Sequence, residues 1–145
     1  MGDISKDINF KFPNERVKAL INIKHTANWL NTVGNEFLKP FKISNQQYNI
    51  LRILKGTNEA VTVNMVKDRM IEKSPNATRL MDKLCVKGLI ERTRCENDRR
   101  VVFVKISEKG LKLLDKIKID EFDSHMNSIS EEESKILNTI LDKIR

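Results

Sequence analysis

The sequence predicts a mainly α-helical fold with one β-hairpin, in a single domain over residues 1–145. Three observations carry this prediction. Apolar residues recur at helical spacing along most of the chain. Serine, threonine and asparagine stand where helices would begin, and a strand-like composition occurs only between residues 89 and 106. A chain of 145 residues with 39% hydrophobic side chains is long enough to bury one core.

The first expected element is a long helix that begins after Asn14 and ends before Pro40. An asparagine side chain caps a helix N-terminus, and proline disfavours helical geometry in the residue before it. Apolar residues keep a helical spacing through residue 38. A helix of roughly 24 residues is longer than one small domain can easily bury, so its length favours contacts with a second subunit.

Three shorter helices are expected in the middle of the chain. Ser44 opens the first with a capping box, a serine followed three residues later by glutamine, and Gly56 closes it. Thr62 can cap the second. Ser74 precedes a proline at the first position of the third helix, which ends at Gly88.

The period then changes to that of a β-hairpin. The runs 89–94 and 101–106 are rich in residues that favour strands. Between them lies a polar turn that contains Asp98, Arg99 and Arg100. The hairpin therefore carries concentrated positive charge at its tip.

Two helices are expected to complete the chain. Ser107 caps the first, whose apolar side runs to Met126, and Ser130 opens the second with another capping box. One small domain cannot hide all these apolar stripes, so residues 14–39 and 107–145 are assigned to dimerisation. The residues expected in that interface are Leu20, Leu30, Ile136, Leu137, Ile140, Leu141 and Ile144.

Positive charge is concentrated outside the C-terminal helices. The chain has a net charge of +7. Residues 62–106 hold eleven basic and six acidic side chains, whereas residues 107–145 hold seven and nine. A basic block favours a polyanionic partner, although a surplus of this size is equally consistent with an ordinary solvated surface.

The composition also excludes several classes of protein. No apolar run approaches the roughly 18 residues that a membrane span needs, and no secretory signal is expected. Two cysteines cannot form a disulfide scaffold, and two histidines give no metal site of ordinary spacing. There is no nucleophile–base motif and no glycine-rich phosphate loop. We expect a cytoplasmic protein that is not an enzyme and holds neither metal nor cofactor.

The middle of the chain matches the requirements of a winged helix-turn-helix. A helix that enters the major groove of DNA needs short polar groups near its N-terminal end. Ser74, Asn76 and Thr78 supply such groups, and Arg79 and Lys83 supply positive charge. The hairpin turn supplies arginines suited to a narrow, electronegative minor groove.

Five motifs stand in order along this part of the chain. They are Gln46-Gln47-Tyr48-Asn49-Ile50-Leu51, Ala77-Thr78-Arg79-Leu80-Met81-Asp82-Lys83-Leu84, Lys87-Gly88-Leu89-Ile90-Glu91-Arg92, Asp98-Arg99-Arg100 and Ser107-Glu108-Lys109-Gly110. In this order and spacing they resemble the multiple-antibiotic-resistance regulator (MarR) family of winged-helix transcription factors, over about residues 44–114. One departure is Met65-Val66-Lys67, where the family usually has a smaller and more acidic run.

The resemblance implies a homodimeric transcriptional repressor that binds an inverted repeat in double-stranded DNA, with residues 44–106 as the DNA-binding lobe. It implies that Asp98 holds an arginine that enters the minor groove, with Arg99 and Arg100 both candidates. It also implies a small aromatic or phenolic effector between the lobe and the dimer helices. The DNA-binding residues expected from the motifs and the family together are Ser44, Ser74, Asn76, Ala77, Thr78, Arg79, Lys83, Arg92, Asp98, Arg99 and Arg100.

Three alternatives stay open at this stage. A winged helix can serve as a protein-interaction module without specific DNA binding, but such a module would show exposed apolar residues where this chain has polar and basic ones. Arg92 is as well suited to bracing the hairpin of residues 89–106, the wing of this fold, as to contacting DNA. Cys85 is expected to be buried and inert, whereas Cys95 lies near several arginines and is the better redox candidate.

Overall fold

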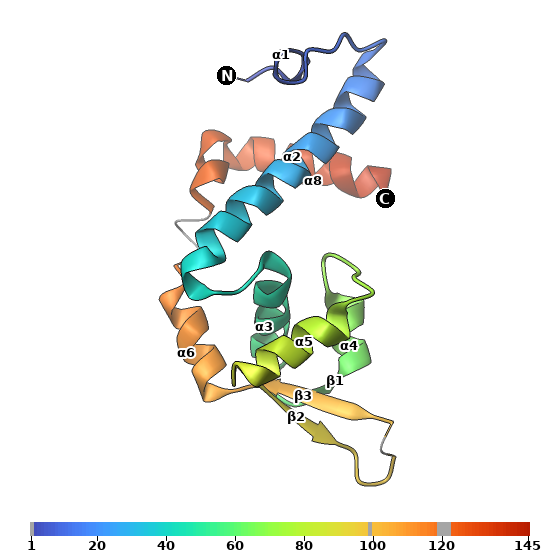
Figure 1. The fold of residues 1–145 in the computed structure, drawn as a ribbon. Helices are drawn as coiled ribbons and strands as arrows, with labels where there is room; N and C mark the ends of the chain where they lie inside the picture. Colours follow the sequence, from blue (N-terminus) through green and yellow to red (C-terminus); the bar gives the residue numbers. More distant parts are fainter. Residues whose placement is uncertain (1, 99, 119–122) are drawn as a thin grey trace.

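Helices make up most of the structure, and a small antiparallel sheet lies at one end of it (Figure 1). The computed structural model describes residues 2–98, 100–118 and 123–145. The helical elements are α1 (Ile4–Asp7), α2 (Glu15–Leu38), η1 (Lys39–Phe41), α3 (Asn45–Thr57), α4 (Val63–Arg69), α5 (Ala77–Val86), α6 (Glu108–Lys116), η2 (Asp123–Ser128) and α8 (Glu131–Ile144). The strands are β1 (Val61–Thr62), β2 (Ile90–Arg94) and β3 (Val102–Ile106). The predicted fold class is therefore confirmed.

The helices begin at the predicted caps. Ser44, Ser107 and Ser130 each accept a hydrogen bond from a backbone N–H of the first turn, and the first and last of them complete capping boxes. Asn14 caps α2 and Thr62 caps α4 in the same way. Each cap satisfies a backbone N–H that has no partner within its helix. This is a local effect, which is why the sequence alone locates these helix starts.

Two boundaries in the lobe differ from the prediction. Gly56 does not close α3, because the helix continues to Thr57 and Asn58 then adopts the left-handed conformation at φ 58°. Helix α5 begins at Ala77 and not directly after Ser74. Residues 74–76 form a turn instead, which the N–H of Ala77 closes on the carbonyl of Ser74 at 3.1 Å.

The C-terminal part is less continuous than predicted. Helix α6 ends at Lys116 because Ile117 adopts an extended conformation with ψ 103°. The predicted helix through Met126 is therefore wrong, and this methionine lies in the short 3-10 helix η2. Residues 119–122 lie outside the described part of the chain.

The sheet has the strand order β1-β3-β2, and both pairings are antiparallel. Strands β2 and β3 form the predicted hairpin, with Ile90 opposite Ile106. Strand β1 was missed from the sequence, because two residues are too few to show an alternating pattern. Val61 pairs with Val104, and this pairing ties the start of α4 to the hairpin.

The core lies within the lobe built from α3, α4, α5, α6 and the sheet. Its fully buried large side chains come from four different elements: Ile50, Leu51, Leu54, Val66, Met81, Leu84 and Val104. Because α5 contributes two of these side chains, the core fixes the orientation of that helix and hence of its outer face.

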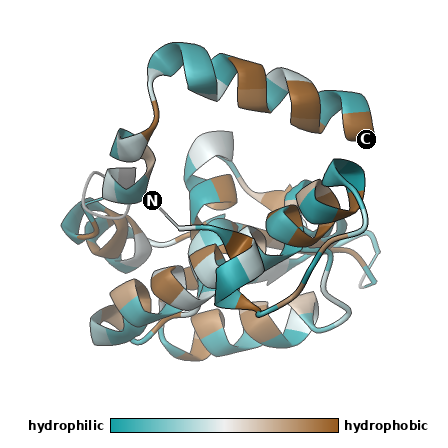
Figure 2. Ribbon diagram, turned by 90° about the horizontal axis from the view of Figure 1, so that it is seen from above, coloured by the Kyte–Doolittle hydropathy of each residue, from teal (hydrophilic) through white to brown (hydrophobic). Residues whose placement is uncertain are grey.

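Helix α8 stands apart from this core, with apolar residues along its length (Figure 2). Of the seven residues assigned to dimerisation, five are exposed in the single chain: Leu20, Ile136, Leu137, Ile140 and Ile144. Leu30 and Leu141 are half-buried. Within the described residues, no helix combines the length and the apolar character needed to cross a membrane.

Candidate nucleic-acid interface

Helix α5 turns one face to the core and the other to solvent. The buried residues lie three or four positions apart: Ala77, Met81 and Leu84. Between them, Arg79, Asp82 and Lys83 are exposed and Thr78 is half-buried. From Thr78 to Lys83 the outer face of α5 is therefore polar and basic, as the sequence predicted, and the helix ends at Val86, which is 90% exposed.

One residue of the predicted DNA-binding set belongs to the core instead. Ala77 has 0% exposure, so the expectation that it contacts DNA is corrected. It occupies the first helical position on the inward stripe, where a small side chain lets α5 pack closely. Its place in the family motif therefore reflects packing and not contact.

Two serines of the predicted set already serve the fold. The hydroxyl of Ser44 accepts the N–H of Gln47 at 3.2 Å, and the N–H of Ser44 donates to the side chain of Gln47 at 3.2 Å. The hydroxyl of Ser74 accepts the N–H of Asn76 at 3.2 Å. The Asn76 side chain makes no capping hydrogen bond to α5 and is exposed, so its amide remains available to an external partner.

An ion pair joins α5 to the hairpin. The guanidinium of Arg92 in β2 donates to the carboxylate of Asp82. This contact favours the bracing role of Arg92 over a direct DNA contact. It also neutralises the acidic side chain on the outer face of α5, which leaves Arg79 and Lys83 as the charges that this face presents.

Asp98 makes two hydrogen bonds to backbone N–H groups at the tip of the hairpin. The carboxylate of Asp98 accepts the N–H of Arg100 at 3.0 Å, and the carbonyl of Asp98 accepts the N–H of Val101 at 2.9 Å. No ion pair joins Asp98 to Arg94 or Arg100, both of which are described, and both arginines are exposed. Arg99 lies outside the described residues. Asp98 therefore shapes the wing through the backbone.

The two cysteines are both free and half-buried. Burial raises the pKa of the Cys85 thiol, and the nearby charge of Arg92 opposes this effect. A raised pKa keeps the thiol protonated and slow to react. This agrees with the interpretation of Cys85 as an inert packing residue.

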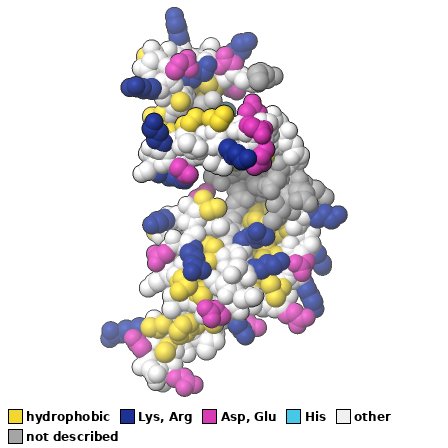
Figure 3. Space-filling model, turned by 180° about the vertical axis from the view of Figure 1, so that it is seen from behind, with side chains coloured by type: hydrophobic (Ala, Val, Ile, Leu, Met, Phe, Trp, Pro, Cys, Tyr) yellow, Lys and Arg dark blue, Asp and Glu magenta, His cyan; other side chains and the backbone are white. Residues whose placement is uncertain are grey.

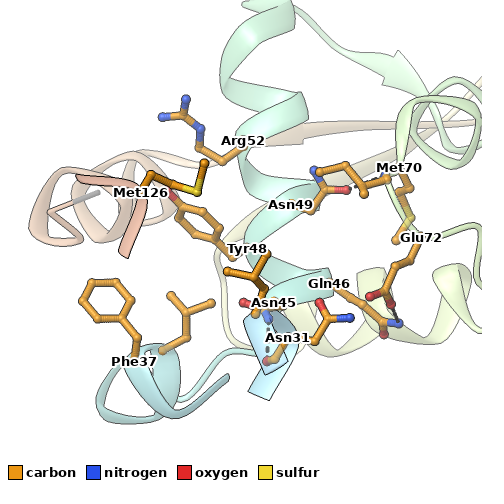
Figure 4. A pocket seen from close by; sticks show the side chains of 13 residues that line it. Asn31, Phe37, Asn45, Gln46, Tyr48, Asn49, Arg52, Met70, Glu72 and Met126 are labelled. Atoms are coloured by element: carbon orange, nitrogen blue, oxygen red, sulfur yellow. Dashed lines mark hydrogen bonds between the residues drawn. The ribbon is translucent and has the colours of Figure 1, made fainter. Parts of the chain in front are cut away.

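A cavity of about 490 Å³ lies where α2, α3, η2 and the segment after α4 meet (Figure 4). Apolar side chains line much of it, among them Leu30, Phe37, Leu38, Met70 and Met126. Polar side chains also face it, among them Asn31, Asn45, Asn49 and Glu72. The family resemblance implied a site in this position but not its residues, because four segments distant in sequence contribute to it.

Comparison with known proteins assigns the family. The sequence model of the family described as transcriptional regulator SarA/Rot matches residues 33–117. The chain belongs to this family. That match covers more than half of the 145 residues, including α3 to α6 and the hairpin, and it confirms the predicted winged-helix transcriptional regulator.

Individual relatives agree with this assignment. The HTH-type transcriptional regulator MhqR of Bacillus subtilis is 27% identical over 131 residues, which is 88% of this chain and 90% of MhqR. The fold matches a structure of mutant MarR from E. coli complexed with operator DNA, with a TM-score of 0.71, 23% identity and 99% of each chain covered. It also matches the organohalide-sensing regulator RdhR in its 2,4-dichlorophenol-bound form, with a TM-score of 0.80, 23% identity, and coverage of 94% and 86%. The MarR-type fold of this SarA/Rot member is thus established.

Proposed function

We propose that this SarA/Rot regulator binds double-stranded DNA of a specific sequence, with α5 in the major groove and the β2–β3 hairpin at the adjacent minor groove. The observation that carries the proposal is the polar and basic outer face of α5 beside an arginine-bearing wing. Arg79 and Lys83 can contact phosphates or bases, and Asn76 and Thr78 are short polar groups at the N-terminal end. Arg100 at the hairpin tip suits the minor groove.

We further propose that the protein acts as a homodimer on an inverted repeat. Residues 14–39 and 107–145 would form the dimerisation region and residues 44–106 the DNA-binding lobe. The exposed apolar residues of α8 support this division, because one chain leaves them in water. Figure 3 shows apolar side chains gathered on the upper helical part of the molecule. A twofold dimer would cover them and set two α5 helices about one DNA turn, ~34 Å, apart.

A small aromatic or phenolic molecule is the effector we propose for the cavity. Two features support it: the mainly apolar lining with a few polar groups, and the phenol bound by the RdhR structure of the same fold. The cavity joins the proposed dimer helices to the lobe, so its occupancy can change how α5 is presented. We infer that the empty protein is the DNA-binding repressor and that it acts through binding and not through catalysis.

A selection from random DNA duplexes, repeated at two salt concentrations, tests this function. We expect an enriched inverted repeat, bound by the dimer with a steep salt dependence, because several phosphates lose their counterions on binding. A protein that enriches no sequence, or that binds all duplexes with the same affinity, would contradict sequence-specific recognition. Binding to another protein through the α5 face would support the interaction-module alternative.

A further inference from the structure

The segment between α4 and α5, residues 70–76, leads directly into the proposed DNA-binding helix, and two side chains of α3 hold it. The N–H of Ile71 donates to the side-chain oxygen of Asn49 at 3.0 Å. The amide nitrogen of Gln46 donates to the carboxylate of Glu72 at 2.6 Å. Gln46 and Asn49 lie three positions apart on α3, so they share one face of the helix. Figure 4 shows both on the side of the cavity that Met70 and Glu72 also line.

Apolar packing fixes this segment only at its first residue. Met70 is 4% exposed and anchors its beginning, but the next side chain, Ile71, is 87% exposed. The turn at residues 74–76 then feeds the chain into Ala77, which is buried at the start of α5. Between Met70 and that turn, two hydrogen bonds join the segment to α3: the N–H of Ile71 donates to Asn49, and the amide of Gln46 donates to Glu72.

We propose that Gln46 and Asn49 form a polar clasp that positions the N-terminal end of α5 for DNA reading. This inference rests on the proposed DNA-binding function, and it assigns a role to two residues that do not lie on the DNA-facing surface. The side chain of Asn49 accepts the backbone N–H of Ile71 and so anchors this exposed residue to α3, next to the buried Met70. Because both bonds lie in the cavity wall, a molecule in the cavity contacts the clasp directly.

Asn49→Ala removes the acceptor of Ile71 and nothing else in the clasp, and Asn49→Asp is its matched control because it keeps a side-chain oxygen. In the isotopically labelled full-length protein, we expect Asn49→Ala to speed amide hydrogen exchange at Ile71 by about tenfold. We also expect the amide resonances of residues 70–79 to shift while those of β2 and β3 stay in place. Asn49→Asp should restore slow exchange and the wild-type resonances.

The DNA arm uses the duplex enriched by the selection described above. Asn49→Ala should bind that duplex about tenfold more weakly and random DNA equally well, and Gln46→Ala should have the same direction of effect. Unchanged exchange at Ile71, unmoved α5 resonances, or full cognate affinity in Asn49→Ala would each overturn the clasp. A wild-type protein without any preferred duplex would instead overturn the proposed function, and the exchange and resonance arms would still decide the clasp.

Discussion

The lobe and the flanking helices differ in how completely they bury their apolar side chains. In the lobe, α3, α4, α5 and β3 enclose seven fully buried large residues, and among the described residues no buried side-chain nitrogen or oxygen lacks a hydrogen-bond partner. In α8, by contrast, Ile136 is 60% exposed and Ile144 is 64% exposed. The lobe buries its core within one chain, whereas α2 and α8 leave apolar side chains exposed, which we propose form one half of a dimer interface. We therefore expect folding and assembly to depend on different residues.

The largest loss of DNA affinity is expected from substitutions in the proposed dimer interface on α8. Ile140→Glu combined with Leu141→Glu places two carboxylates on the apolar stripe of α8. A charge is costly to bury without a partner, so the dimer should dissociate. Loss of the second half-site should weaken cognate DNA binding by about a hundredfold or more. Sedimentation should show a monomer of 16.8 kDa, and binding is measured by titration of the enriched duplex.

The matched control adds the same charge to the polar side of α8. Asn138→Glu with Thr139→Glu should remain dimeric and lose only the modest affinity expected from added negative charge. If the wild-type chain sediments as a monomer at micromolar concentration and still binds a palindrome tightly, then the contrast between lobe and interface does not describe assembly.

A second experiment separates folding from assembly. Leu51 is 0% exposed in the lobe, so Leu51→Ala should lower the free energy of unfolding by ~2–5 kcal/mol, through lost transfer energy and a residual cavity. Ile136→Ala removes a similar side chain from an exposed site, and it should weaken dimerisation while barely changing the stability of the lobe. Urea denaturation at two protein concentrations distinguishes the two, since only the Ile136 effect should depend on concentration. If both variants lost the same free energy of unfolding at both protein concentrations, the proposed difference between the lobe and the dimer interface would be wrong.

The same contrast explains what the sequence could predict. The caps at Ser44, Ser107 and Ser130, and the hairpin of β2 and β3, depend on neighbouring residues and on local periodicity, and the structure confirms them. The exposed apolar stripe of α8 also follows from helical spacing alone. These features are local, so no knowledge of the tertiary fold was needed.

Features that depend on distant contacts were predicted less well. Strand β1 exists because Val61 meets β3 far along the chain, and two residues carry no pattern of their own. Ala77 belongs to a DNA-contact motif by position but is buried by the core. The hydrogen bond from Gln46 to Glu72 joins residues 26 positions apart. Local propensity contains no information on such pairs, so they appear only in the folded chain.

Within the lobe, the outer face of α5 can be tested for sequence reading. Thr78 is half-buried and lies near the N-terminal end of α5. Thr78→Ala should lower the affinity for the cognate duplex by ~1–3 kcal/mol, the usual cost of losing a good base contact, and should leave random DNA nearly unaffected. Thr78→Ser is the control that keeps the hydroxyl. Equal losses on both duplexes would mean that Thr78 contacts only the backbone.

Substitutions in the wing should change DNA affinity least, but they distinguish most clearly between a role of turn geometry and a role of charge. Asp98 accepts the N–H of Arg100, so we expect it to hold the turn at the hairpin tip. Asp98→Ala removes this acceptor and makes the protein more positive. Charge alone would then strengthen DNA binding, whereas a loosened turn should weaken cognate binding about three- to tenfold, the cost of ~1 kcal/mol for one hydrogen bond.

Asp98→Asn separates the two roles, because its oxygen can still accept the N–H of Arg100 while its charge is gone. We expect Asp98→Asn to bind as well as the wild type or better, with unchanged thermal stability in both variants. If Asp98→Asn is as weak as Asp98→Ala, the carboxylate charge is required and the wing acts through an ion pair formed on DNA. If both variants bind more tightly, the hairpin tip is a generic basic loop, and its turn geometry has no part in recognition.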